Sequence, residues 1–79
     1  MLREKKTYPV VTFPNTTAAL AMEAACKENG MPGRIIPMPS VLSAGCGLSW
    51  RAAEEEHDLI CAFLDEKGLL YQAVHVVEL

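Results

Sequence analysis

The chain has 79 residues, which suits a single domain over 1–79, because a second hydrophobic core would need more chain. Apolar residues make up 51% and charged residues 22%, a balance that excludes a disordered chain. Ten acidic and seven basic side chains leave a net charge of -3, which argues against nucleic-acid binding, since that depends on neutralising phosphates. No apolar run approaches the ~20 residues of a membrane span, so we predict no membrane contact.

The N-terminus is charged over residues 1–7, and we expect it to fray. No long apolar segment follows, so we predict no secretory signal and a cytoplasmic protein. In that compartment, the thiols of Cys26, Cys46 and Cys61 should stay reduced. An odd number of cysteines argues against a disulfide framework, and the spacing of zinc-binding pairs is missing. We therefore predict neither a metal nor a cofactor.

The first half of the chain predicts a strand followed by a helix. Residues 8–13 are rich in β-branched and aromatic side chains, which is typical of a strand. Asn15 suits a helix N-cap, and the alanine-rich segment 16–29 predicts the helix itself. Gly30 should close this helix in the left-handed conformation. Cys26 falls on the apolar helix face, so we expect it in the core.

The second half predicts a strand pair, a helix and a last strand. Residues 33–38 should form an edge strand, because Pro37 cannot donate to a sheet ladder. Alternating apolar and polar residues predict a half-buried strand over 48–52. Residues 53–67 should form a helix and residues 71–79 a strand. The apolar stripe of that helix is predicted to be Leu59, Ile60, Phe63 and Leu64.

This order of elements, βαββαβ, favours one fold class. Each strand–helix–strand half crosses over with right-handed geometry, so both helices reach the same face of the sheet. The expected result is an α+β, ferredoxin-like two-layer sandwich with a four-stranded antiparallel sheet in the order 4-1-3-2. The proline-bearing second strand and the last strand then lie at the two edges.

One cysteine stands between two glycines, in Gly45-Cys46-Gly47. Glycines allow unusual backbone angles and close approach by another molecule. Consecutive amides in such a turn can form an anion-binding nest, which stabilises the nucleophilic thiolate. We therefore predict Cys46 as the reactive residue, and a buried, inert cysteine as the alternative. The neighbours expected to assist binding are Gly45, Gly47, Ser43, Ser40 and Arg51, with Arg34 as a further nearby cation.

We expect no catalytic or metal-binding role for the remaining candidate residues. Cys61 follows His57 by four residues, which places both on one helix flank. Two ligands make an incomplete metal site, so we expect a boundary cysteine beside a solvated histidine. We expect structural or solvated roles for Trp50, Tyr71, His75 and the run Glu54-Glu55-Glu56.

Three segments resemble one known family. They are Val10-Val11-Thr12-Phe13-Pro14-Asn15-Thr16-Thr17-Ala18-Ala19-Leu20, Ile35-Ile36-Pro37-Met38-Pro39 and Ser43-Ala44-Gly45-Cys46-Gly47-Leu48. They look like the putative selenium/sulfur carrier protein-like family of small bacterial domains, over about Tyr8 to Val77. The resemblance implies that Cys46 holds sulfur or selenium as a persulfide or selenosulfide. It also implies donor and acceptor proteins as partners.

One position departs from this family. Members often carry arginine directly after the second proline, where this chain has Ser40. If that arginine steadies an anionic sulfur species, Arg51 must substitute for it, or activity is reduced. We expect a carrier more than a self-contained enzyme, because turnover would belong to its partners. The alternative is a non-catalytic module that binds a small anion or a protein, with Cys46 structural, and a homodimer stays open in either case.

Overall fold

The computed structural model describes residues 6–42 and 47–78, and it has the predicted order of elements. The elements are β1 (Thr7–Thr12), α1 (Thr16–Asn29), β2 (Arg34–Pro37), β3 (Leu48–Arg51), the 3-10 turn η1 (Glu54–Glu56), α2 (His57–Lys67) and β4 (Ala73–Glu78). The helix expected over 53–67 therefore begins with a 3-10 turn, in which the Ala53 amide donates to Glu56 Oε1 at 2.6 Å.

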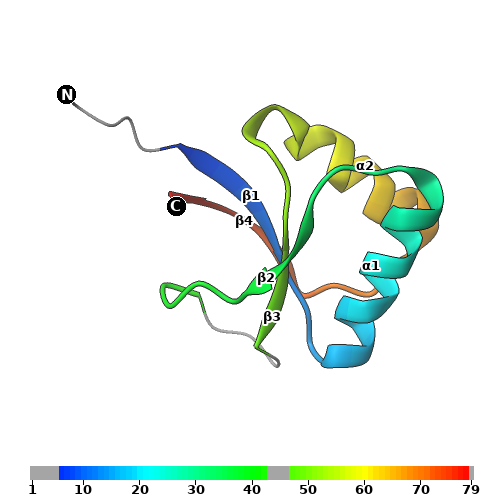
Figure 1. Ribbon diagram of the computed structural model, residues 1–79, viewed down its shortest axis with the longest axis horizontal. Coiled ribbons are helices and arrows are strands. Elements are labelled where there is room, and N and C mark those ends of the chain that lie inside the picture. Colours follow the sequence, from blue (N-terminus) through cyan, green and yellow to red (C-terminus); the bar gives the residue numbers. More distant parts are fainter. Residues whose placement is uncertain (1–5, 43–46, 79) are drawn as a thin grey trace.

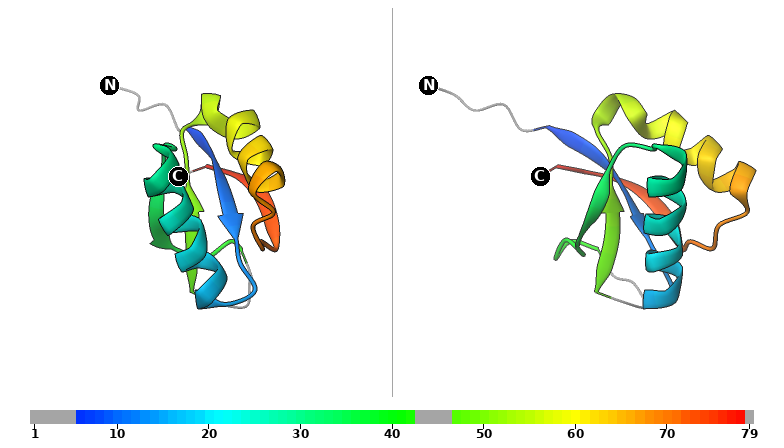
Figure 2. Two further views of the ribbon diagram at one scale, coloured as in Figure 1. Left: turned by 90° about the vertical axis from the view of Figure 1, so that its right-hand side faces the viewer. Right: turned by 45° about the vertical axis from the view of Figure 1, so that its right-hand side comes forward.

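The four strands form one antiparallel sheet in the order β2-β3-β1-β4. This is the predicted order read from the other edge, so the placement of β2 and β4 at the two edges is confirmed. Both helices lie on one side of the sheet (Figure 1). Figure 2 shows α1 beside α2, with α1 over the β2–β3 half of the sheet. The molecule is thus an α+β fold with two layers.

The ends of the helices follow from local chemistry. Asn15 Oδ1 accepts a hydrogen bond from the Ala18 amide at 2.8 Å, as expected of an N-cap. Gly30 (φ 65°) and Gly68 (φ 60°) end α1 and α2 in the left-handed conformation, which glycine adopts at low cost.

The hydrophobic core fills the space between the sheet and the helices. It takes Val11 and Phe13 from the β1 segment, and its other fully or almost fully buried side chains include Met22, Cys26, Trp50, Ile60, Phe63 and Leu64. The prediction was wrong for Leu59, which is 50% exposed because it lies at the margin of the Ile60–Phe63–Leu64 stripe. Tyr71 was also expected to pack, but it is exposed, since it precedes the start of β4.

Gly33, just before β2, lets the backbone pass very close to β3. Its φ is 115°, a conformation that L side chains rarely adopt. A Cβ here would lie 2.6 Å from the Arg51 carbonyl oxygen and would also collide with the Trp50 indole. That indole donates to the Pro32 carbonyl at 3.3 Å. Only glycine therefore lets the two strands approach at this point.

Candidate functional site

The predicted thiol lies on the connection between β2 and β3. Cys46, Gly45 and Ser43 lie outside the described residues. The two ends of the connection are held together, because the Met38 amide donates to the Gly47 carbonyl at 2.9 Å. This bond extends the β2–β3 pairing by one step beyond Pro37 and Leu48. The segment that carries the cysteine thus connects the two strands of a hairpin at its paired end.

Residues 38–42, which we call the arm, lead into this segment. Leu42 donates its amide to the Pro39 carbonyl at 3.0 Å, which closes a turn. The arm leaves the sheet on the side away from the helices (Figure 1). Ser40 is exposed on it, and Val41 is 77% exposed. The arm is therefore open to solvent at Ser40 and Val41.

Gly47 does not use the conformational freedom that its sequence context suggested. The described glycines with positive φ are Gly30, Gly33 and Gly68, so Gly47 lies outside the left-handed region. No atom lies within 4 Å of the position that a Cβ would take at Gly47. Gly47 therefore does not use a positive φ, and no described atom crowds the position of its missing side chain.

Arg51 and Arg34 face each other at the other end of the same hairpin. Arg51 lies four residue steps beyond Gly47 along an extended strand, or about 13 Å between their Cα atoms. The Arg51 guanidinium lies over the Tyr8 ring, with its Cζ 4.4 Å from the ring centroid. Tyr8 precedes Val10, the residue that pairs with Arg51, so this contact turns the guanidinium away from the Gly47 end of the hairpin.

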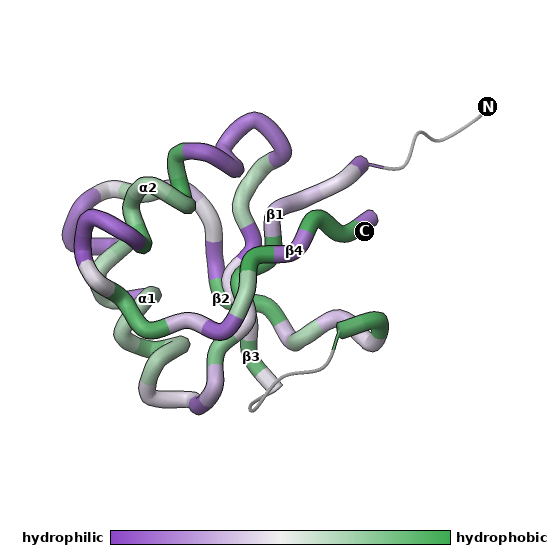
Figure 3. The backbone as a smooth tube through the Cα atoms, turned by 180° about the vertical axis from the view of Figure 1, so that it is seen from behind, coloured by the Kyte–Doolittle hydropathy of each residue, from purple (hydrophilic) through white to green (hydrophobic). Residues whose placement is uncertain are grey.

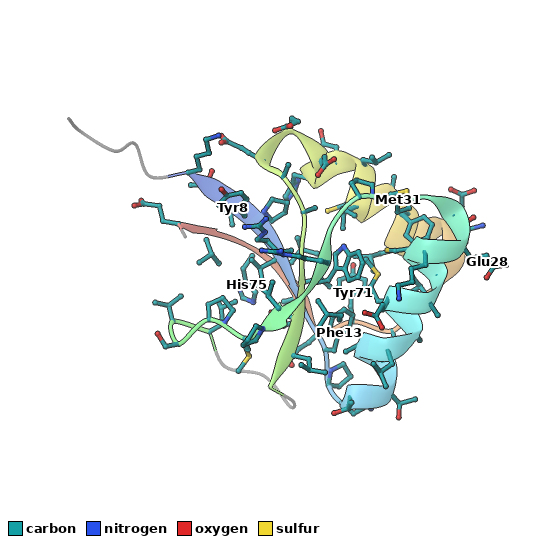
Figure 4. All side chains as sticks on the ribbon, in the orientation of Figure 1. Tyr8, Phe13, Glu28, Met31, Tyr71 and His75 are labelled. Carbon is teal, nitrogen blue, oxygen red and sulfur yellow. The ribbon has the colours of Figure 1, made fainter. Side chains whose placement is uncertain are left out.

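These residues belong to the side of the sheet that the helices leave uncovered, which we call the open face. The register places four residues in one row across it: Arg34, Arg51, Val10 and His75. Figure 4 shows Tyr8 and His75 on this side and Phe13 on the side of the helices. The next row contains Ser49 and Thr12, both fully buried. Thr12 Oγ1 donates to the Ala73 carbonyl at 3.3 Å, whereas Ser49 Oγ has no partner within the described residues.

Sequence pattern alone does not place Tyr8, Ser49 and His75 beside Arg51. Each comes from a different part of the chain, and only strand register brings them to one face. Alternation within each strand was the available signal, because it places Ser49 and Arg51 on the same side. Which residues of β1 and β4 lie opposite them depends on the pairing.

The other two cysteines have different environments. Cys26 is fully buried in the core, as predicted, and burial raises the pKa of its thiol from 9.0 to about 11. Cys61 is half-buried, with its Sγ 4.0 Å from His57 Nε2. His57 Nδ1 lies 3.2 Å from Asp58 Oδ1. Within the described ranges, no three His, Cys, Asp or Glu side chains gather closely enough to hold a metal ion.

Comparison with known proteins supplies a family. The profile of the family described as "Putative Se/S carrier protein-like" matches residues 8–76, almost the whole chain. The chain belongs to this family. Nothing among curated proteins or solved structures matches it. A member of the Se/S carrier family passes its cargo onward, so membership implies interaction with other proteins. None of the helices in the described part of the chain has the length and apolar character to cross a membrane.

Proposed function

We propose that this protein carries sulfur or selenium on the thiol of Cys46, at the end of the β2–β3 hairpin of a ferredoxin-like sandwich. Family membership over residues 8–76 is the observation that carries the proposal. Cys46 stands in the motif Ser43-Ala44-Gly45-Cys46-Gly47-Leu48, on which the resemblance to the family depends most. The candidate binding residues stay those of the loop and its surroundings: Gly45, Gly47, Ser43, Ser40 and Arg51.

The chemistry needs no oxidant. The Cys46 thiolate attacks the outer sulfur of a donor persulfide, a new S–S bond forms, and the donor's S–S bond breaks. The electron pair of the broken bond leaves with the donor thiolate. In the second transfer, a nucleophile of the acceptor attacks the outer sulfur and Cys46 leaves as the thiolate. Selenium follows the same path when the donor is a selenopersulfide.

Three features of the described residues support a thiol that works on a partner. The hairpin end is closed by the Met38–Gly47 hydrogen bond, so the loop has a defined base. A side chain at Gly47 would meet no atom within 4 Å, and the arm is exposed at Ser40 and Val41. No pocket opens among residues 6–42 and 47–78, which suits transfer between docked proteins better than catalysis on an enclosed substrate.

A mass shift tests the proposal. The reduced protein is incubated with a small-molecule persulfide or selenopersulfide, and the gain is about 32 Da for sulfur or about 80 Da for selenium, since the modified thiol persists long enough to detect. Trypsin separates the three cysteines, because cleavage after Lys and Arg yields peptides 7–27, 35–51 and 52–67. We expect the label on 35–51 and its loss in Cys46→Ser.

Cys61→Ser is the matched control, because Cys61 is a half-buried thiol outside the loop, and this variant should keep the label on 35–51. Equal labelling of peptides 35–51 and 52–67 would contradict a dedicated Cys46 carrier. The alternative module, which binds an anion or a protein without covalent chemistry, makes the opposite prediction. Protein alkylated at Cys46 would then bind its ligand as well as untreated protein.

A further inference from the structure

Charge is divided between the two layers of the molecule. Eight acidic residues lie on the helical elements, two on α1, three on η1 and three on α2, against the two basic residues Lys27 and Lys67. On the open face, the described strand positions hold Arg34, Arg51 and His75 and no acidic residue. Figure 3 shows the hydrophilic stretches concentrated at η1 and the helix ends. A chain of net charge -3 therefore presents a basic sheet surface.

The two arginines of this surface lie directly opposite each other. Arg34 and Arg51 pair across β2 and β3, an arrangement that places like charges side by side and disfavours folding. Neither has a carboxylate partner within the described chain. Arg34 is exposed, while Arg51 is half-buried and its direction is set by the Tyr8 ring. A guanidinium group can bind a carboxylate with paired, charge-assisted hydrogen bonds, and two arginines start from neighbouring positions here.

Two polar atoms of the same face are also without partners in the described structure. They are Arg51 Nε and the hydroxyl of Ser49, and both are buried. Buried polar atoms in folded proteins nearly always form hydrogen bonds, so each exception calls for an explanation. Ser49 and Arg51 are two residues apart on one strand and share the open face. Because both atoms are shielded from solvent, a partner on this face would touch Arg34, Tyr8 and the exposed part of Arg51 instead.

The shape and composition of the face indicate the kind of molecule that binds there. No pocket opens on the described residues, so a small ion would stay exposed to water on every outer side. Tyr and Arg are the residues enriched at the centre of protein–protein interfaces, and Tyr8 stacks here with Arg51. The arm adds an exposed apolar residue, Val41, on the same side of the sheet. Figure 3 shows the arm as a hydrophobic segment.

Two other occupants fit less well. A symmetric pair of chains joined through their open faces would bring four arginines together without a counter-charge. Single-stranded RNA is read by stacking two or three bases on sheet aromatics. The open face offers Tyr8 alone, because Phe13 and Trp50 lie on the side of the helices.

We propose that the open face, centred on Arg34, Arg51 and Tyr8, is a docking surface for a partner protein that presents acidic side chains. In terms of the proposed function, on which the identity of this partner rests, the partner is the donor or acceptor of the carried atom. The arm lies on the same side of the sheet as this face, and it leads to the end of the hairpin, so docking here would bring a partner near that end.

The test uses the full chain and a short synthetic oligoglutamate peptide, with oligoglutamine as the uncharged control. Backbone amide chemical shifts are followed during titration. We expect saturable shifts in the strands of the open face with oligoglutamate alone. Arg34→Glu should weaken binding by about tenfold or more, because charge-assisted hydrogen bonds are lost and a repulsion is added. Arg34 is exposed, so this variant should fold, and its far-UV circular dichroism verifies that it does.

A matched variant separates position from net charge. Lys27→Glu makes the same change of charge on the helical layer and should leave the affinity within about twofold, since exposed charges at a distance are screened by salt. Equal weakening by Lys27→Glu and Arg34→Glu would overturn the proposal. So would tighter binding of inorganic phosphate or of a single-stranded oligonucleotide to the open face, or shifts that depend on protein concentration without peptide.

The outcome is independent of the sulfur chemistry. The peptide titration does not involve Cys46, and the small-molecule persulfide does not require docking. If the docking proposal is wrong, Arg34→Glu and the original chain both bind no oligoglutamate. The persulfide label still appears on peptide 35–51 in that case. If the carrier chemistry fails, the label is missing while the peptide still binds.

Discussion

The buried thiol of Cys26 should resist alkylation strongly in the folded protein. Burial raises its pKa from 9.0 to about 11, so at about pH 8 the folded protein holds about a hundredfold less thiolate at this residue. The side chain is also fully buried, which excludes the reagent. Reaction through unfolded molecules is slow as well, because a stability of about 5 kcal/mol leaves a fraction of ~10⁻⁴ unfolded.

Iodoacetamide labelling followed by tryptic peptide mapping measures this directly. Cys26 lies in peptide 7–27 and Cys61 in peptide 52–67, so both rates come from one sample. We expect peptide 7–27 to react at least about a hundredfold more slowly than 52–67. In denaturant, the two rates should become similar, because burial no longer separates the thiols.

Labelling of Cys26 within about tenfold of Cys61 in the folded chain would refute this reasoning, since a two-unit difference in pKa alone demands more. It would show that α1 leaves the sheet often enough to expose its core face. The same data serve the carrier proposal, because Cys26 then acts as an internal standard for an inert thiol.

Three further predictions concern stability, measured as the free energy of unfolding in urea. Gly33→Ala should lower it by at least about 2 kcal/mol, because the φ of 115° is strained and the Cβ would meet the Arg51 carbonyl. Asn15→Ala should lower it by about 1 kcal/mol, because the Ala18 amide loses its acceptor. Raising the pH from about 9 to about 11 should remove about 2 kcal/mol, since Cys26 ionises first in the unfolded chain and the folded chain keeps its proton.

Each of these has its own control. Gly47→Ala adds the same methyl group in open space and should change stability little, so equal losses at Gly33 and Gly47 would contradict the steric argument. Asn15→Asp keeps a capping oxygen and should retain most of the stability. The loss at high pH should flatten in Cys26→Ala, and an unchanged profile would assign it to other titrating groups.

Local chemistry accounts for what was predictable in the fold. Asn15, the alanine-rich segment and Gly30 act within one helix, and the structure has that helix over Thr16–Asn29 as predicted. The error at Leu59 has a different origin. Helical periodicity shows which face of a helix is apolar, but not which residues at the edge of that face are buried. For Leu59, at that edge, burial depends on what the helix packs against.

The candidate thiol was chosen from local pattern, and its role stays a prediction, because Cys46 lies outside the described residues. Its expected helper Arg51 lies at the far end of the hairpin, over Tyr8. Loop proximity in the sequence had favoured a contact with the thiolate. The strand between Gly47 and Arg51 is extended, and about 3.3 Å per residue carries the arginine away.

The order of elements, the edge position of the proline-bearing strand, the helix caps and the burial of Cys26 were all determined by the sequence, because each depends on neighbouring residues or on a chain crossover of fixed hand. Only the tertiary structure decided that Tyr8, Arg34, Arg51 and His75 share the face of the sheet opposite the helices. Cross-strand register depends on how the whole sheet pairs and packs, and no local stretch of the chain contains that information.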